Sequence, residues 1–357
     1  MFLRTAAIVA AALCLYACGG EPDESGAAAD APETLATLLD EYFEKNLELN
    51  PLSATSIGDD RYDDRYANSI GPEYRAARHE LNTTFLQRLE SIDRSALNRQ
   101  EILSYDMFKL ARESALAAEA YPSHLAPMNQ FRSATSSFVR LGSGSGLHPF
   151  ETVKNYDDFL SRIGGFTAYV DQAIANMREG IDQGVTQPKI LMQKFLPQLE
   201  SQLVDSVEES GFYSPIETMP EDFSAADRER LTEAYKVAIE RQLIPAFARL
   251  HHFIETVYIP AARESVGLLA LPNGDDWYAH NVRVITTTEL TPEEIHQIGL
   301  NEVQRIHDEM RGVMQKVGFD GDLQDFFQFV NEDPAFFYSE PEQLIQAYRD
   351  MSADIEK

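Results

Sequence analysis

The helical spacing of apolar residues, which continues along almost the whole chain from Glu33, is the feature that most constrains its fold. The spacing begins with apolar side chains at i, i+3, i+4, i+7 and i+8 of one helical face, namely Leu35, Leu38, Leu39, Tyr42 and Phe43. A short stretch rich in β-branched residues, 281–288, is expected to be the end of a helix; a short strand is the alternative. The pattern therefore predicts an all-α, multi-helix fold in which residues 33–357 form one large domain.

Proline residues divide this pattern into separate helices. Asn50 precedes Pro51, and a residue before proline is disfavoured in the α conformation, so the first helix should end there. A long helix over residues 224–265 contains Pro245, which should kink or split it. Five further helices are expected over residues 71–92, 98–120, 151–163, 166–183 and 188–208.

Two more segments have distinct local signals. Residues 133–149 include alternating glycine and serine, and we expect the longest non-helical interval there, as a flexible loop that lines a groove. Thr291, Pro292 and Glu294 together form the strongest helix start in the chain, with a threonine cap, a proline in the first turn and a glutamate that closes the capping box. That helix should continue to about Val317.

The last segment is a helix that should start near Pro341. Its apolar face, formed by Leu344, Ile345, Tyr348, Met351 and Ile355, is followed by neither a glycine nor a cap before Lys357. We interpret the chain as the N-terminal part of a longer domain. The alternative is a terminal helix that packs on the body.

The N-terminal residues have the layout of a bacterial lipoprotein signal. Arg4 precedes an apolar run, 5–17, that is too short to span a bilayer, and the run ends in Leu-Tyr-Ala before Cys18. This end resembles a lipobox, which implies cleavage before Cys18 and a lipid on that residue; an ordinary signal peptide or an uncleaved anchor is the alternative. Residues 1–17 are therefore expected to be the signal peptide and residues 18–32 a disordered acidic spacer.

The charge of the chain limits its partners. A formal net charge of −28 excludes a nucleic-acid-binding role, which depends on Lys and Arg neutralising phosphates, and it disfavours docking on anionic lipid headgroups. The lipid would then be the link to a membrane facing the periplasm, and Gly19 after Cys18 favours the outer membrane. The same acidity favours substrates with basic or free amino ends. The mature domain has no disulfide, because Cys14 and Cys18 are the only cysteines.

No motif marks a complete metal site. His79-Glu80 begins a His-Glu-x-x-His zinc motif but lacks its second histidine. His251 and Glu255 lie one helical turn apart beside His252, and such a group supplies too few ligands for a tight site. We therefore assign neither a metal ligand nor a catalytic residue in this chain.

A tight turn at residues 271–274 is followed by Trp277, Tyr278 and His280. Aromatic side chains beside a turn are more often packing residues than recognition residues. We nevertheless take these three as the candidates for a substrate groove.

Several stretches resemble the bacterial family called domain of unknown function 885. They are residues 155–162, 176–181, 187–189, 271–274 with Tyr278, and 287–303. The likeness extends from about residue 35 to the end of the chain, and 287–303 is its most specific part.

The resemblance implies a nearly all-helical exported lipoprotein related to helical zinc peptidases, such as the thimet-oligopeptidase and carboxypeptidase-Taq types, which hold a deep channel between two helical halves. In this family a His-Glu pair followed by Pro-Gly-His forms the metal element, and this sequence lacks it. Zinc is therefore expected only in a full-length relative, and enzymatic activity of this chain stays open. We expect part of a peptide-binding channel; the alternative is a non-catalytic binding or scaffold lipoprotein.

Overall fold

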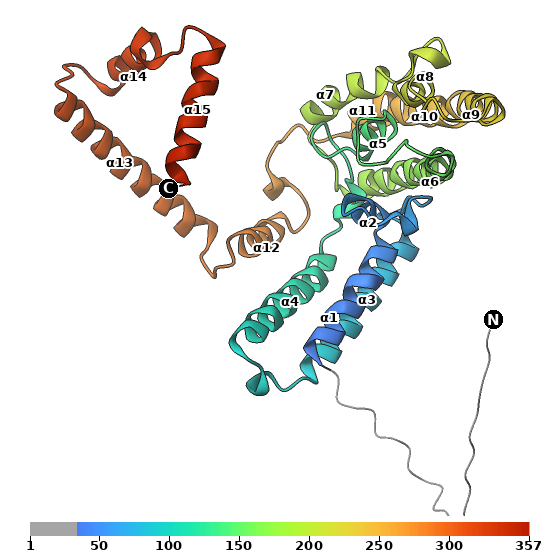
Figure 1. Cartoon of the computed structure of the whole chain (residues 1–357). Coiled ribbons are helices and arrows are strands. Elements are labelled where there is room, and N and C mark those ends of the chain that lie inside the picture. The colour runs from blue at the N-terminus through green and yellow to red at the C-terminus, as the bar shows by residue number, and fades with distance from the viewer. Residues whose placement is uncertain (1–33, 357) are drawn as a thin grey trace, which may run out of the picture.

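The computed structural model describes residues 34–356 and confirms the all-α prediction (Figure 1). Within that range the only β pairing is one isolated bridge between Pro188 and Arg263. Over the same residues, every helix is too short or too polar to serve as a membrane span. The predicted signal peptide, the lipidation site Cys18 and the acidic spacer lie outside the described residues.

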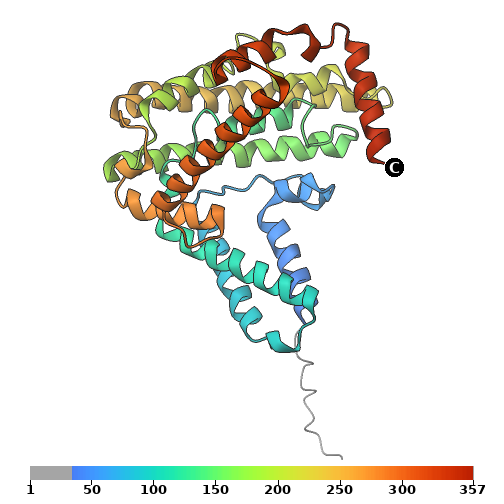
Figure 2. The same cartoon turned by 90° about the vertical axis from the view of Figure 1, so that its left-hand side faces the viewer.

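Three helices form an arm that projects from the rest of the molecule (Figures 1 and 2). They are α1 (Leu35–Leu49), α3 (Pro72–Glu90) and α4 (Arg99–Ala117), and a short helix, α2 (Pro51–Ser56), leads from the arm to the body. The arm has its own apolar core of buried leucine and aromatic side chains, among them Leu38, Phe85 and Leu89. Asn98 and Glu101 form the capping box that starts α4, as their spacing predicts.

The body is built around the long helix α6 (Val153–Gln183), which packs against α9 (Ala225–Ala238) and α10 (Ile244–Phe253). The other helices of the body are α5 (Ala134–Gly142), α7 (Lys189–Glu200), α8 (Ser214–Glu217) and α11 (Ile259–Ala261). Stacked aromatic rings fill the core; Phe138 and Phe166, for example, have centroids 4.0 Å apart. Burial of each such ring contributes about 1.5–3 kcal/mol, so the body is stabilised without a disulfide.

The long helix expected over 224–265 does form, from α9 to α11, with two wider turns. Residues 239–243 and 254–258 are π-helical, and each π turn comes just before a proline, Pro245 or Pro260. A proline cannot donate to the carbonyl four residues earlier, and its ring clashes with that carbonyl. The expected interruption at Pro245 therefore takes the form of a π turn.

Three boundaries predicted from the sequence are wrong. The two helices expected over 151–163 and 166–183 are one helix, α6, in which Gly165 serves close packing: a Cβ there would lie 2.5 Å from the carbonyl oxygen of Tyr66. The interval 133–149 contains α5, which is capped by Ser133 and packs so closely that a Cβ on Gly142 would lie 2.3 Å from the ring of Phe159. Helix α7 ends at Glu200, eight residues earlier than expected.

The C-terminal part, α12 (Gly274–Thr286), α13 (Pro292–Val317), α14 (Leu323–Glu332) and α15 (Pro341–Ile355), extends away from the body in Figure 1. Residues 281–286 end a helix, and the capping box of Thr291 and Glu294 starts α13, both as predicted; α14 was not predicted. Apolar side chains of α13 and α15 are exposed, among them Val303 and Tyr348. All five residues of the predicted apolar face of α15 are at least 43% exposed.

Candidate functional site

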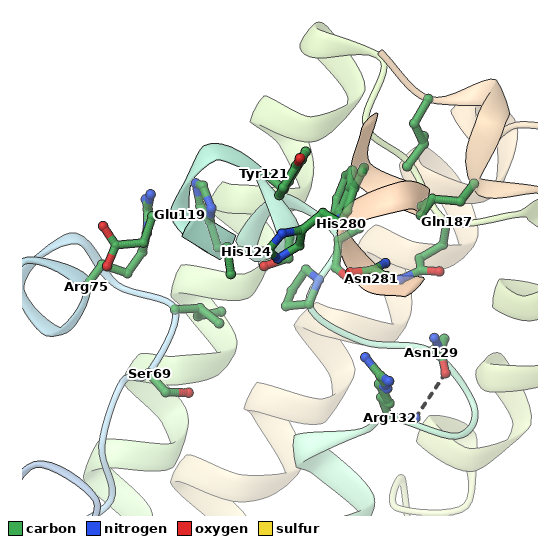
Figure 3. A pocket seen from close by; sticks show the side chains of 18 of the residues that line it. Ser69, Arg75, Glu119, Tyr121, His124, Asn129, Arg132, Gln187, His280 and Asn281 are labelled. Carbon is green, nitrogen blue, oxygen red and sulfur yellow. Dashed lines mark hydrogen bonds between the residues drawn. The ribbon is translucent and has the colours of Figure 1, made fainter. Parts of the chain in front are cut away.

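A pocket of about 1040 Å³ lies where the arm, the body and α12 meet (Figure 3). Its walls come from α3, the end of α4, the segment 118–132, the turn between α6 and α7, and residues 263–281. Polar and charged side chains line it, namely Ser69, Arg75, Arg78, Glu119, Tyr121, Ser123, His124, Asn129, Arg132, Tyr169, Thr186, Gln187, Arg263, Trp277, His280 and Asn281. Segments more than 200 residues apart in the sequence thus share one cavity.

The charge of the pocket is opposite to that of the whole protein. Four arginines and a single glutamate line it, with neither an aspartate nor a lysine. That glutamate, Glu119, is already paired with His79 at 2.7 Å. Among the described residues, none of the four arginines forms an ion pair with a carboxylate. The expectation from net charge, that a ligand would be basic, therefore does not hold for this surface.

Arg132 lies at the opposite side of the pocket from Arg75 (Figure 3), and Arg263 belongs to the same lining; hydrogen bonds of the main chain hold both arginines. The side chain of Asn129 accepts hydrogen bonds from the amides of Phe131 and Arg132 at 2.9 and 3.0 Å, which shapes the turn that presents Arg132 (Figure 3). The carbonyl of Arg263 accepts from the amide of Lys189 at 2.8 Å. The buried Nε of Arg263 has no hydrogen-bond partner, and burial lowers the pKa of this guanidinium.

Arg75 lies on α3, on the other side of the pocket, near His124. Burial lowers the pKa of His124, and the charge of Arg75 lowers it further, so the imidazole is neutral near pH 7. Glu119 and Arg78 also belong to this side. The negative charge of Glu119 partly offsets the two arginines here, whereas a carboxylate is absent from the Arg132 side.

An aromatic wall closes the pocket at α12. The ring of Tyr121 stacks on Trp277, with centroids 5.7 Å apart, and lies 4.9 Å from the ring of His280. The Tyr121 hydroxyl donates to the carbonyl of Asp276 at 3.2 Å. Burial lowers the pKa of His280 as well, so this wall is uncharged at neutral pH.

The structure brings together two of the three groove candidates from the sequence. Trp277 and His280 line the pocket, whereas Tyr278 is 44% exposed and is not part of its lining. The loop around Gly144, expected to line a groove, is also not part of this pocket.

The floor of the pocket is tied to α6. The buried amide of Asn176 donates to the carbonyls of Ile70 and His124, at 3.0 and 3.1 Å, and so joins two pocket segments. A Cβ on Gly180 would lie 2.7 Å from the carbonyl oxygen of Leu125, so glycine permits that segment to pack on the helix. The side chain of Gln187 donates to the carbonyl of Ala126 at 2.8 Å.

The four arginines were not identified from the sequence. Arg75 and Arg78 lie one helical turn apart, but long stretches of chain separate them from Arg132 and Arg263, and the four follow no motif. Only the packing of the arm and α12 on the body places them in one cavity.

The described residues do not form a zinc site. His251 Nδ1 lies 3.9 Å from Glu255 Oε2, and no group of three or more His, Cys, Asp and Glu side chains is arranged around a point between residues 34 and 356. His79 of the incomplete zinc motif is paired with Glu119.

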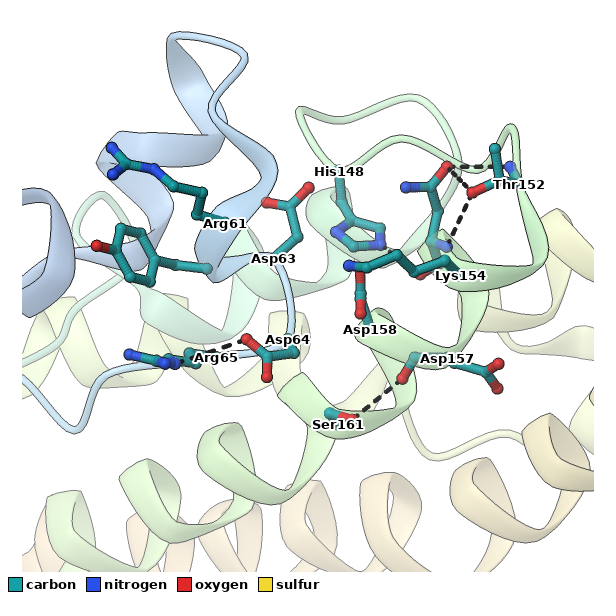
Figure 4. A network of polar contacts seen from close by, with 12 residues as sticks. Arg61, Asp63, Asp64, Arg65, His148, Thr152, Lys154, Asp157, Asp158 and Ser161 are labelled. Atoms are coloured by element: carbon teal, nitrogen blue, oxygen red, sulfur yellow. Dashed lines mark hydrogen bonds and ion pairs between the residues drawn. The ribbon is translucent and has the colours of Figure 1, made fainter.

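A second polar cluster lies inside the body and is closed to ligands (Figure 4). The guanidinium of Arg162, which is fully buried, contacts Asp63 at 2.9 Å, His148 Nδ1 at 2.7 Å and Thr55 Oγ1 at 2.5 Å. Asp63 and His148 are each only 2% exposed. Each of these polar groups contacts another member of the cluster. The cluster therefore joins α2 and the segment that follows α2 to α6.

The fold has a relative among solved structures. A crystal structure named "putative lipoprotein from Colwellia psychrerythraea" matches with a TM-score of 0.72 and 20% identity, over 90% of this chain and 58% of that one. This chain thus spans 58% of the length of the Colwellia protein. No curated protein is similar enough to count as a match. The model of a family described as "Bacterial protein of unknown function (DUF885)" matches residues 51–357, and the chain therefore belongs to the DUF885 family.

Proposed function

We propose that this chain is the peptide-binding part of an exported, lipid-anchored protein, and that the pocket between arm, body and α12 is the binding site. The observation that carries the proposal is a cavity of about 1040 Å³ lined by polar groups from five parts of the chain. Pockets for small ligands usually measure about 300–1000 Å³, so this one has room for several residues of a peptide.

The chemistry of the lining suits a peptide main chain. The side chains of Asn129, Gln187 and Asn281 offer amide donors and acceptors, which match the amides of a peptide backbone. The stacked pair Tyr121 and Trp277 offers a flat apolar surface for a side chain. The resemblance to helical zinc peptidases agrees with a peptide ligand. Hydrolysis by a full-length relative would need a set of metal ligands from outside the described residues.

A titration with an uncharged peptide tests this proposal. Trp277 is the only tryptophan of the chain and lines the pocket, so its fluorescence reports on occupancy. An octapeptide acetylated at its N-terminus and amidated at its C-terminus should change this fluorescence with saturation. Asn281→Ala, which removes one hydrogen-bonding side chain worth about 1 kcal/mol, should weaken binding about fivefold.

The matched control is Asn331→Ala on α14, an exposed asparagine outside the pocket, which should bind as the wild type does. Absence of saturable binding up to millimolar peptide, by fluorescence and by calorimetry, contradicts the proposal. Equal affinities of the Asn281→Ala variant and the wild type for the peptide would place the peptide elsewhere on the protein.

The lipid anchor rests on Cys18 and on the likeness to the Colwellia protein, whose name describes it as a lipoprotein. Mass spectrometry of the mature N-terminus, after expression in a bacterium that exports it, should find Cys18 as the first residue with a diacylglyceryl group and an acylated amine. An unmodified Cys18, or another N-terminal residue, contradicts the anchor.

A further inference from the structure

We infer that the Arg132 side of the pocket is an anion subsite that recognises the free C-terminal carboxylate of a bound peptide. This inference rests on the proposed function, since it assigns a ligand class to the same pocket. The subsite is formed by Arg132 and Arg263, with the amide side chains of Gln187 and Asn281 in the same lining.

Arg132 and Arg263 lack a counter-charge within the part of the chain that the structure describes. In this acidic chain, arginines commonly pair with carboxylates; Arg94 with Asp106 and Arg249 with Asp171 are examples. Arg132 and Arg263 have no such partner among the described residues. The one carboxylate of the pocket lining, Glu119, is paired with His79, so these two arginines form a positive surface that a ligand anion can occupy.

The hydrogen bonding of the Arg263 guanidinium is incomplete. Its Nε is buried and unpartnered, and its Nη2 makes one long contact of 3.5 Å with the carbonyl of Gly267. A guanidinium has five N–H donors in a planar fork, which fits the two oxygens of a carboxylate. An anion that pairs with this fork would offset the cost of a desolvated charge.

The net charge of the protein and the charge of the pocket act on an anion over different distances. The net charge of −28 repels an anion at long range, but salt screens charges beyond about 8 Å at physiological ionic strength. Inside the pocket the nearest charges are arginines, so the local attraction decides binding. We expect added salt to speed association of an anionic ligand and to weaken the final complex.

The second side of the pocket is a poorer anion site. There Glu119 lies with Arg75 and Arg78, and its charge opposes a carboxylate. This asymmetry sets the direction of a bound peptide, with its C-terminal end at Arg132 and its preceding residues toward Tyr121 and Trp277.

The test uses N-acetylphenylalanine and its amide, which differ only in the terminal charge. Binding is followed by calorimetry and by Trp277 fluorescence. The acid should bind at least about tenfold more tightly than the amide, as expected for charge-assisted hydrogen bonds. Arg132→Gln, at an exposed side chain whose loss leaves the core unchanged, should remove most of that preference. Arg263→Gln should remove it too, and Arg263→Lys should retain part of it.

Two controls fix the location. Arg241→Gln, at an arginine of the body with a side chain 74% exposed, should leave the preference unchanged. Arg75→Gln should reduce it less than Arg132→Gln does. If Arg75→Gln loses the preference for the acid over the amide while Arg132→Gln retains it, the assignment of the subsite to the Arg132 side is overturned.

The outcomes separate this inference from the proposed function. Equal binding of acid and amide, or binding of neither, overturns the inference, whereas the uncharged octapeptide tests the pocket independently. Inorganic phosphate that displaces the acid at concentrations below that of the acid itself would assign the subsite to phosphate and also overturn the inference.

Discussion

Arg162 on α6 and Asp63, which follows α2 by seven residues, form an ion pair of 2.9 Å in which both side chains are at most 3% exposed. Thr55 and His148 complete the hydrogen bonds of this pair. The pair therefore joins the base of the arm to the longest helix of the body, next to the segments that form the pocket.

Asp63→Asn should destabilise the protein by about 3–5 kcal/mol, because it leaves the Arg162 guanidinium buried without a counter-charge. The measurement is the free energy of unfolding in urea. The matched control is Asp157→Asn, which removes an aspartate from a pair with Arg230 that is almost half exposed, and it should cost less than about 1 kcal/mol. Similar losses in the two variants would contradict the structural role of the buried pair.

His148 should make stability depend on pH. Its Nδ1 faces the guanidinium of Arg162, and its Nε2–H donates to the carbonyl of Asn155 at 2.8 Å. Burial is the largest effect and lowers the pKa of His148, and the charge of Arg162 lowers it further. The hydrogen bond to Asn155 and the charges of Asp63 and Asp158 raise the pKa but do not cancel the net lowering. The unfolded chain then binds a proton first, near pH 6.5, so the stabilisation is complete above that pH and decreases as the pH falls.

Urea midpoints of the wild type and of His148→Gln, measured between about pH 8 and 5, check this sign. The difference in urea midpoint between the wild type and the variant should shrink below about pH 6.5. Only in the wild type does an imidazole that is neutral when buried take up a proton on unfolding. A constant difference in urea midpoint across this pH range would show that His148 does not contribute to the pH dependence of stability.

The chain should bind no stoichiometric zinc. His251 and Glu255 are the nearest approach to a ligand pair on α10 and the π turn after it, and their atoms are 3.9 Å apart without a third ligand among residues 34–356. Calorimetry with zinc chloride and metal analysis after dialysis measure this. One tight zinc ion per chain that is lost in a His251→Ala, His252→Ala double variant would contradict the expectation.

The exposed apolar faces of α13 and α15 should make the chain associate with itself. Leu344 and Tyr348 lie on one face of α15 and are 43% and 60% exposed. Contiguous apolar surface of this kind favours association and dye binding. Sedimentation velocity over a hundredfold range of concentration should show self-association that Leu344→Lys with Tyr348→Lys reduces. A monomer at all concentrations, with no change in the double variant, is the contrary result.

The helices could be predicted from local signals, whereas the pocket could not. The capping box of Thr291 and Glu294 could be predicted because both partners lie within one segment of four residues. The sequence predicts separate helices over 151–163 and 166–183, but Tyr66, the neighbour that requires the missing side chain of Gly165, lies 99 residues earlier in the chain. Arg132 and Arg263 line one pocket only through tertiary packing, which leaves no periodic pattern in the sequence. Trp277 and His280 were found because a turn and aromatic residues adjoin them in the sequence.

The position of a peptide in a co-crystal structure of this chain tests the central claim most directly. The measurement uses a free-acid octapeptide at saturating concentration. The account predicts density in the pocket between α3 and α12, with main-chain contacts to Asn281 and the terminal carboxylate at Arg132 and Arg263. Peptide density elsewhere on the chain, with this pocket empty, would contradict it.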